Sequence, residues 1–156
     1  HLAPSLRPEV ATIFALRDEH LAALTLPDAE AARWEVLLQV RAELTRAIEP
    51  LRKAGDIGHA LDTAVTLYAG KDLARDLAAL GTDLRALFIV SRLEIKDIAE
   101  APADSLPAQE VENLRISVAR AAGEKCSRCW IYSTELGTDP AHSDACPRCT
   151  AVLRDL

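Results

Sequence analysis

Apolar residues recur at helical spacing in the first third of the chain. The clearest stretch begins near Asp28, which can cap a helix, and ends near Lys53 and Gly55, where a basic turn and a glycine favour termination. Its apolar positions, three or four residues apart, are Trp34, Leu37, Val40, Leu44, Ile48 and Leu51. Its charged residues, including Glu43, are expected largely on the opposite side, and Pro50 should kink the helix or end it early.

Further along the chain, the spacing of apolar positions becomes typical of strands and short helices. We expect strands at residues 63–68, 84–90, 93–98 and 114–118. The segment 84–90 is nearly all apolar, which indicates a strand buried on both faces, whereas 114–118 alternates and should have one face in water. A helix is expected at 71–80 and a loop at 99–110. Residues 9–26, which lie between two prolines, are compatible with a further short helix.

The only four cysteines of the chain fall as two C-x-x-C pairs, Cys126 with Cys129 and Cys146 with Cys149. This spacing is typical of a zinc site, because each short turn lets both sulfurs reach one ion. Four thiolates at about 2.3 Å complete a tetrahedral shell and leave no position for water or substrate, so the single Zn²⁺ that we expect is structural. The alternatives are two disulfides, a dithiol redox site, or a site of three cysteines and one histidine in which His142 replaces one sulfur.

The composition favours a soluble intracellular protein over a disulfide-rich secreted one. Four cysteines in 156 residues are few for a disulfide scaffold, and the chain opens without a basic start or an apolar signal. No apolar run approaches the roughly twenty residues of a membrane span. The lack of any Met is expected of an excerpt from a longer protein or of a processed one. Because the net charge is −6, nucleic acid would be attracted only by a local basic patch.

Basic and aromatic residues gather around the thiols. Lys125, Arg128 and Arg148 flank the cysteines, Arg120 precedes them, and Trp130 follows the second thiol. Looped RNA requires cations for its phosphates and flat rings for its unstacked bases, so these five residues are candidate RNA contacts. Alternatively, the cations offset the negative charge of a zinc–thiolate centre, and Trp130 covers the small core, a role that we favour for this residue over stacking. No paired carboxylates or glycine-rich phosphate loop point to catalysis, and we predict no catalytic residue.

Together these features predict an α+β fold with a long N-terminal helix, a small mixed sheet with a packed helix, and a C-terminal four-cysteine zinc ribbon. We expect a helical segment at residues 1–62, a small α/β domain at 63–119 and a zinc-binding domain at 120–156. The last part is too short to build much core alone, so the metal should supply much of its folding free energy, on the order of 10 kcal/mol.

Specific neighbours accompany the cysteine pairs: the run 123–130, Tyr132, Gly137, His142 and the run 146–149. This pattern resembles the C-terminal zinc segment of bacterial isoleucyl-tRNA synthetases. The resemblance continues upstream in Trp34, Leu37, Val40, Arg41, Ile48, Glu49, Arg52, Ile57, Gly58, Leu61, the run 64–68 and the run 101–104. Formamidopyrimidine-type DNA glycosylases carry similar paired cysteines, so the upstream match is what makes the resemblance specific. One departure is Ile131, which stands where His is common in the synthetases.

The resemblance implies that the chain is the end of the anticodon-binding domain plus the zinc-binding tail of a class I synthetase, which attaches isoleucine to its tRNA with ATP in the cytoplasm. It implies a non-catalytic part whose four cysteines bind zinc and whose partners are the anticodon arm of tRNA and the upstream domains of the same chain. The alternatives are a purely structural zinc module or the zinc-finger tail of a formamidopyrimidine-type DNA glycosylase. A glycosylase tail should follow a helix–two-turn–helix module, whereas an alternating strand precedes the thiols here.

Overall fold

The computed structural model describes residues 26–81 and 83–154. The short helix expected at residues 9–26 lies almost entirely outside this described part. The chain divides into two units, residues 1–32 and 33–156. The first unit contributes only the start of one helix to the described structure, and the second holds both sheets and the remaining helices.

Helix α1 spans Asp28–Ala54 and confirms the long helix that the sequence predicts. Acidic residues lie in its first turn, and its basic last turn leads to Gly55, whose φ of 82° belongs to the left-handed region that ends helices. The helix continues past the exposed Pro50 to Ala54, so it does not end early there, and the kink stays a prediction. The missing backbone donor is tolerated because the buried face up to Ile48 and the partly buried Leu51 pack against the core.

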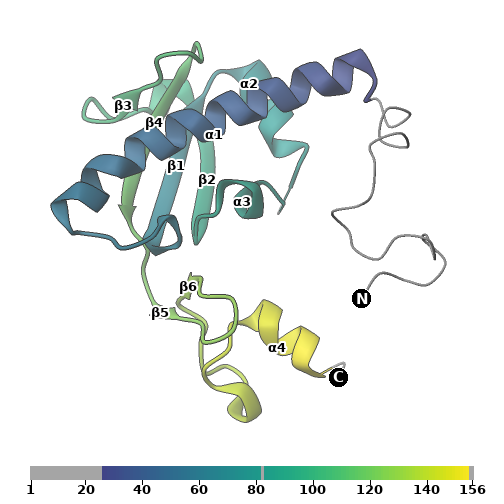
Figure 1. The fold of residues 1–156 in the computed structure, drawn as a ribbon, viewed down its shortest axis with the longest axis vertical. Coiled ribbons are helices and arrows are strands. Elements are labelled where there is room, and N and C mark those ends of the chain that lie inside the picture. The colour runs from purple at the N-terminus through teal and green to yellow at the C-terminus, as the bar shows by residue number, and fades with distance from the viewer. Residues whose placement is uncertain (1–25, 82, 155–156) are drawn as a thin grey trace, which may run out of the picture. The chain divides into compact units, whose positions relative to one another are not determined.

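The central sheet is mixed, as predicted, with strand order β2-β1-β4-β3. Strand β1 (Thr63–Ala69) pairs in parallel with β2 (Arg92–Asp97) and antiparallel with β4 (Leu114–Arg120). The two-residue strand β3 (Leu106–Pro107) pairs with β4 at the edge, within the segment expected to be a loop. The three long strands confirm those expected at residues 63–68, 93–98 and 114–118. Figure 1 shows α1 crossing one face of this sheet.

The apolar segment 84–90 does not form the predicted buried strand. Most of it belongs to helix α3 (Asp83–Phe88), which follows α2 (Lys71–Ala78), the helix expected near residues 71–80. Leu84 and Phe88 are buried and stand four residues apart, on one side of the helix. Short apolar runs fit a strand and a buried helix equally well. The parallel pairing of β1 and β2 decides here, because it requires a crossover connection that helices supply.

One hydrophobic core joins α1, the sheet, α2 and α3. From α1 it receives Leu37, Val40, Leu44 and Ile48, all predicted as apolar-face positions. Trp34 departs from the prediction, with 37% of its surface exposed. Glu43 departs in the opposite direction and is only 4% exposed. Its carboxylate accepts hydrogen bonds from the N–H groups of Gln109 (2.8 Å) and Glu110 (2.7 Å) and pairs with Arg46, so the buried charge is satisfied.

The zinc module, which we define as residues 123–154, has its own small sheet and helix. Strand β5 (Glu124–Lys125) pairs antiparallel with β6 (Tyr132–Ser133), and α4 (Pro147–Arg154) begins at the second cysteine pair. Gly123 leads into β5 with a φ of 90°, and a Cβ at this position would overlap the backbone of Ser133. Only glycine therefore allows the hairpin to close at this point.

Short 3-10 helices at Ala60–Asp62, Ile98–Glu100 and Pro140–His142 complete the described elements. None of the described helices combines the length and the low polarity that a membrane crossing needs. The α+β class is confirmed, whereas the domain boundaries after residues 62 and 119 stay a prediction.

Candidate metal centre and nucleic-acid interface

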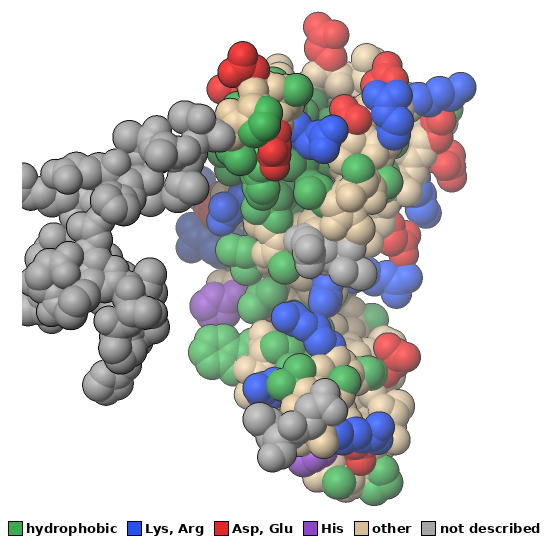
Figure 2. Space-filling view, turned by 90° about the vertical axis from the view of Figure 1, so that its right-hand side faces the viewer, with side chains coloured by type: hydrophobic (Ala, Val, Ile, Leu, Met, Phe, Trp, Pro, Cys, Tyr) green, Lys and Arg blue, Asp and Glu red, His purple; other side chains and the backbone are tan. Residues whose placement is uncertain are grey.

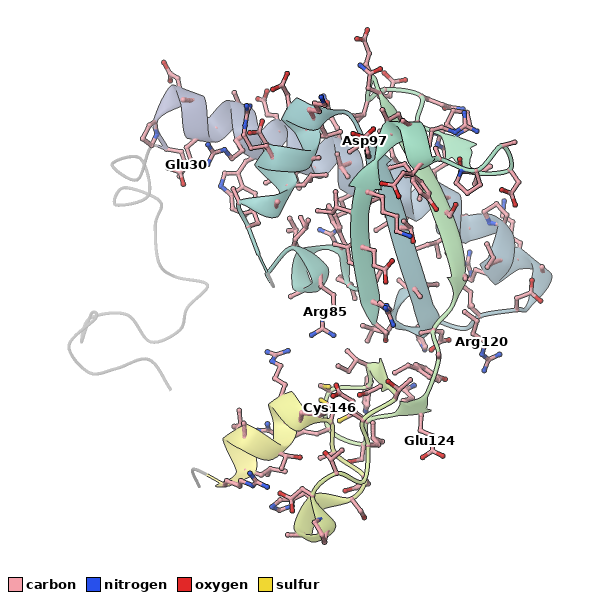
Figure 3. All side chains as sticks on the ribbon, turned by 180° about the vertical axis from the view of Figure 1, so that it is seen from behind. Glu30, Arg85, Asp97, Arg120, Glu124 and Cys146 are labelled. Atoms are coloured by element: carbon pink, nitrogen blue, oxygen red, sulfur yellow. The ribbon has the colours of Figure 1, made fainter. Side chains whose placement is uncertain are left out.

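The four thiols converge inside the zinc module (Figure 3). Their Sγ atoms all lie within 4.8 Å of one another, and Cys129 Sγ is 3.6 Å from Cys146 Sγ. Four sulfurs at about 2.3 Å from one Zn²⁺ would stand roughly 3.8 Å apart, so the donor set fits a tetrahedral site of four thiolates. Three of the thiols are buried and Cys129 is half-buried. His142 is not in this cluster of the described residues, which speaks against the alternative with three cysteines and one histidine.

Backbone hydrogen bonds shape the two cysteine turns. The N–H of Cys126 donates to the carbonyl of Ile131 at 2.9 Å, and the N–H of Trp130 donates back to the carbonyl of Cys126 at 3.0 Å. The N–H of Ser127 donates to the carbonyl of Asp144 at 3.0 Å and so ties the first turn to the segment before the second. The first pair of thiols is thus presented by a turn that the backbone itself stabilises, and this turn is tied to the segment that leads into the second pair.

Burial and hydrogen bonds shift the pKa values of the thiols in opposite directions. Burial raises the pKa of Cys126, but the backbone N–H groups of Cys129, Cys146 and Arg128 donate to its sulfur and lower that pKa to about 6. Burial raises the pKa of Cys129 to about 12, and it also raises the pKa of Cys149. The backbone therefore stabilises one thiolate, whereas the sulfurs with raised pKa need a cation at the centre to be thiolates at neutral pH.

An ion pair fastens the loop that precedes the second cysteine turn. The buried carboxylate of Asp139 accepts a hydrogen bond from the N–H of Ala141 at 3.0 Å and pairs with the guanidinium of Arg154 at 2.8 Å. The N–H of Ala141 and the cation of Arg154 together hold the pKa of Asp139 below its usual value, against the opposing effect of burial. The end of α4 is thus anchored to this loop.

The predicted RNA contacts fall into three groups. Arg128 and Arg148 occupy the same third position of their C-x-x-C turns, are exposed, and line one hollow of about 350 Å³. Lys125 lies on β5, with its ammonium 5.7 Å from the centre of the Trp130 indole, in cation–π range. Arg120 lies at the end of β4, where its guanidinium donates to a backbone carbonyl after α1 at 3.3 Å. Four of the five residues therefore belong to the zinc module.

Trp130 does not cover the module's core, contrary to the role favoured from the sequence. Its side chain is 62% exposed, and its backbone has a φ of 67°. The core beneath the thiols is instead completed by Ala145, with Ile131, Leu136 and Leu153 packed against it. An exposed indole beside a lysine keeps its flat face accessible to an unstacked base.

The Lys, Arg, Asp and Glu side chains of the zinc module balance, and four thiolates around one Zn²⁺ would add a net charge of about −2. Residues 123–154 contain four Lys and Arg and four Asp and Glu. On the face shown in Figure 2, acidic side chains are most frequent in the upper part, whereas basic ones also extend over the lower part. Any attraction of RNA must therefore come from a local cluster of basic side chains and not from the net charge of the module.

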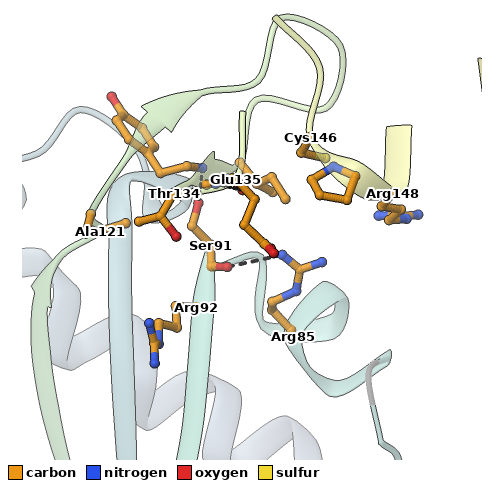
Figure 4. Close-up of a pocket in the computed structure, with 13 residues that line it drawn as sticks. Arg85, Ser91, Arg92, Ala121, Thr134, Glu135, Cys146 and Arg148 are labelled. Atoms are coloured by element: carbon orange, nitrogen blue, oxygen red, sulfur yellow. Dashed lines mark hydrogen bonds between the residues drawn. The ribbon is translucent and has the colours of Figure 1, made fainter. Parts of the chain in front are cut away.

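Three further polar residues near the module were not predicted. Arg85, Ser91 and Arg92 line a pocket of about 350 Å³ to which the zinc module contributes Glu135 and Arg148 (Figure 4). The incorrect strand prediction for residues 84–90 concealed Arg85, and no local motif marks the other two. Only the approach of distant segments brings them together.

Comparison with known proteins first defines the class. Residues 123–152 match the family described as a zinc finger found in FPG and IleRS. Together with the four clustered thiols, this match shows a site for one structural zinc ion. The class is therefore that of zinc-finger proteins, and the description alone leaves two kinds of parent protein.

Similarity along the whole chain distinguishes the two. The chain is 55% identical over 98% of its length to the isoleucine–tRNA ligase of Nitratidesulfovibrio vulgaris. It is 48% identical over its full length to that of Desulfovibrio desulfuricans and 44% identical over 94% to that of Lawsonia intracellularis. It is therefore similar, over nearly its whole length, to one region of these longer isoleucine–tRNA ligases. It spans 16–17% of their length.

Proposed function

We propose that this chain is the C-terminal, tRNA-docking region of an isoleucine–tRNA ligase of the cytoplasm. The parent enzyme charges tRNA with isoleucine using ATP, and upstream domains of the same chain carry that reaction. The region itself is non-catalytic. The support is the similarity to ligases over nearly the whole chain, together with the zinc-finger match at its end. The proposed parts are residues 1–62, the end of the anticodon-binding domain, a junction domain at 63–119 and a zinc-binding domain at 120–156.

In this proposal the metal acts as a scaffold. Cys126, Cys129, Cys146 and Cys149 are its ligands, because their sulfurs form the one clustered donor set of this kind among the described residues. A closed shell of four thiolates offers no site for substrate, so zinc takes no part in chemistry. By fixing both cysteine turns, it holds their side chains ready for RNA with little ordering cost on binding.

The observation that carries the docking role is the placement of the two turn arginines. Arg128 and Arg148 come from different C-x-x-C turns and yet line the same hollow. Lys125 and the exposed ring of Trp130 extend the surface with a cation and a stacking face, and Arg120 adds a cation at the end of β4. Phosphates and unstacked bases of an anticodon arm are the ligand that such a surface suits.

The test reverses the charge of the two turn arginines in the full-length ligase. We expect Arg128→Glu combined with Arg148→Glu to weaken binding of an isoleucine-tRNA transcript at least about tenfold and to make the salt dependence shallower by roughly one to two units of slope. Fluorescence anisotropy over a salt series measures both quantities. Arg75→Glu is the matched control, since Arg75 is exposed on α2 and pairs only with neighbouring acids.

The acidic net charge of −6 favours a second candidate, a zinc clip that braces the parent enzyme and touches no RNA. A clip predicts that the charge-reversed enzyme keeps its zinc, its tRNA affinity and its salt slope. That outcome would replace the docking proposal. Zinc content measured on the same preparation separates a lost contact from a lost fold.

A further inference from the structure

A cleft lies where the α/β body, residues 33–122, meets the zinc module. Arg85 and Arg92, with Ser91 between the ends of α3 and β2, line it from the body. Tyr132 of β6 and Arg148 of α4 line it from the module. Its volume is about 350 Å³, and Figure 4 shows Arg85 on the α3 side and Arg148 on the α4 side.

Ser91 holds the two walls of this cleft together. Its buried hydroxyl accepts a hydrogen bond from the N–H of Tyr132 at 2.7 Å and donates to the carbonyl of Leu61. Among the described residues, this bond to Tyr132 is the one hydrogen bond that joins the body to the zinc module. The carbonyl of Ser91 accepts a hydrogen bond from the guanidinium of Arg85 at 3.1 Å. Ser91 therefore holds Tyr132 of the zinc module through its hydroxyl and the cation of Arg85 through its carbonyl.

The charges lining the cleft have a positive excess. Three arginines, Arg85, Arg92 and Arg148, face one acid, Glu135. Arg92 pairs with Glu94 at 2.6 Å, whereas within the described residues no carboxylate lies within ion-pair distance of Arg85 or Arg148. In a chain of net charge −6, a hollow with two such guanidinium groups stands out against its surroundings.

Two negative groups oppose an anion here. Glu135 carries one charge against the two guanidinium groups that no carboxylate of the described residues pairs, Arg85 and Arg148. The thiol of Cys146 also borders the cleft; it is buried, and with zinc bound it belongs to a four-thiolate centre whose net charge of about −2 is spread over four sulfurs. The first turn of α4, which includes Pro147 and Arg148, adds the positive end of a helix to the same wall.

We propose that this junction cleft binds a phosphodiester group of the RNA backbone, held between the guanidinium groups of Arg85 and Arg148. The inference rests on the proposed function and extends it beyond the zinc module. Arg148 lines both this cleft and the hollow that it shares with Arg128, so the proposed phosphate site borders the surface of the proposed docking function. Planar guanidinium forks suit phosphate oxygens, which accept two parallel N–H donors.

The decisive variant is Arg85→Gln in the full-length ligase, with binding of an isoleucine-tRNA transcript followed over a salt series. Loss of one phosphate contact should weaken binding about five-fold near 0.1 M salt and reduce the salt slope by about 0.7 to 0.9. Arg75→Gln, which removes an exposed cation from α2, should change neither quantity. Because Arg85 also holds Ser91, Arg85→Lys is included: it keeps the charge and should keep most of the slope.

The outcomes separate this inference from the proposed function. If Arg128→Gln weakens binding while Arg85→Gln matches the wild type in affinity and slope, the cleft is not an RNA site although docking stands. If Arg85→Lys loses as much slope as Arg85→Gln, the residue acts through the fold and the inference is overturned. If none of the arginine variants changes binding, docking itself is wrong.

A double variant tests whether one group is shared. If Arg85 and Arg148 hold the same phosphate, the double variant Arg85→Gln with Arg148→Gln should weaken binding by less than the product of the two single effects. The reason is that either single variant already weakens the binding of that phosphate, so the second substitution has less binding left to remove. Effects that multiply fully would assign the two arginines to separate phosphates and overturn the shared site.

Discussion

The α/β body and the zinc module are ordered by different forces. The body buries a cluster of fifteen apolar residues, which come mainly from α1, the central sheet, α2 and α3. The module's buried cluster has four members, and three of them are cysteines of the metal site. Small domains bury too little apolar surface to fold on that basis alone. The comparison teaches that hydrophobic burial stabilises the body, whereas in the module the metal ligands are the core.

Removing the metal should therefore have the largest effect, and only on one side of the junction. Cys126→Ser, or zinc removal by a chelator, should unfold residues beyond about 120, since structural zinc contributes on the order of 10 kcal/mol to such modules. The body should keep its protection, because its core contains no ligand. Hydrogen exchange followed peptide by peptide checks both statements, and tRNA affinity of the full enzyme should fall with the module.

Ser127→Ala is the control for that experiment, since Ser127 is exposed next to the first ligand. Zinc content measured on each sample shows whether the metal has left. A metal-free protein whose module stays protected would show that the small sheet and α4 are stable without coordination, and the contrast between the two parts would disappear.

A substitution in the body's core should produce the converse pattern. Leu67 is fully buried in the middle of β1, so Leu67→Ala should cost about 2–5 kcal/mol of unfolding free energy. Urea unfolding monitored by circular dichroism measures this loss, and the protein should still bind zinc stoichiometrically. Leu38→Ala, at an exposed position of α1, should change the stability by less than about 0.5 kcal/mol. Loss of zinc in Leu67→Ala would mean that the module depends on the body.

The next prediction concerns the buried carboxylate of the body and its pH dependence. Burial raises the pKa of Glu43, but hydrogen bonds from the N–H groups of Glu110 and Gln109, together with Arg46, lower it below its usual value overall. A pKa that is lower in the folded state gives stability that is present above the unfolded value of 4.5 and is lost as pH falls through the folded value. Glu43→Gln should cost about 1–3 kcal/mol at neutral pH and flatten the acid limb of the stability curve.

Urea unfolding at a series of pH values between neutrality and the acid transition measures this dependence. Glu49→Gln provides the comparison, because Glu49 pairs with Arg52 on the surface and should leave the curve nearly unchanged. An acid limb in Glu43→Gln that follows the wild type would show that the buried carboxylate does not couple folding to pH.

The two parts also differ in how far the sequence predicts them. Coordination needs particular residue types at particular spacings, so the cysteine pairs predict the metal centre directly. Alternation predicts β1 and β4 because one side of each is buried. The run 84–90 misleads, since apolarity without a period does not distinguish helix from strand. The sequence also predicts the burial of Glu43 and the exposure of Trp130 wrongly, because both depend on residues distant in the sequence. The N–H groups of residues 109–110 satisfy the carboxylate of Glu43. The small core of the module is filled by thiols and a few apolar side chains, without the indole of Trp130.

The smallest expected effect is at the junction, where Ser91→Ala removes the hydroxyl that joins the two parts. Its loss leaves the N–H of Tyr132 and the carbonyl of Leu61 without this partner and should cost about 1 kcal/mol. The amide of Tyr132 should exchange faster while zinc stays bound, because neither core is touched.

Ser105→Ala is the matched control for Ser91→Ala. Ser105 is similarly buried and its hydroxyl also bridges two groups, but both of them lie within the body. Ser91→Thr keeps the hydroxyl and should restore slow exchange. If Ser91→Ala and Ser105→Ala leave Tyr132 equally protected, the hydroxyl does not couple the body to the module, and the two parts are held together by packing alone.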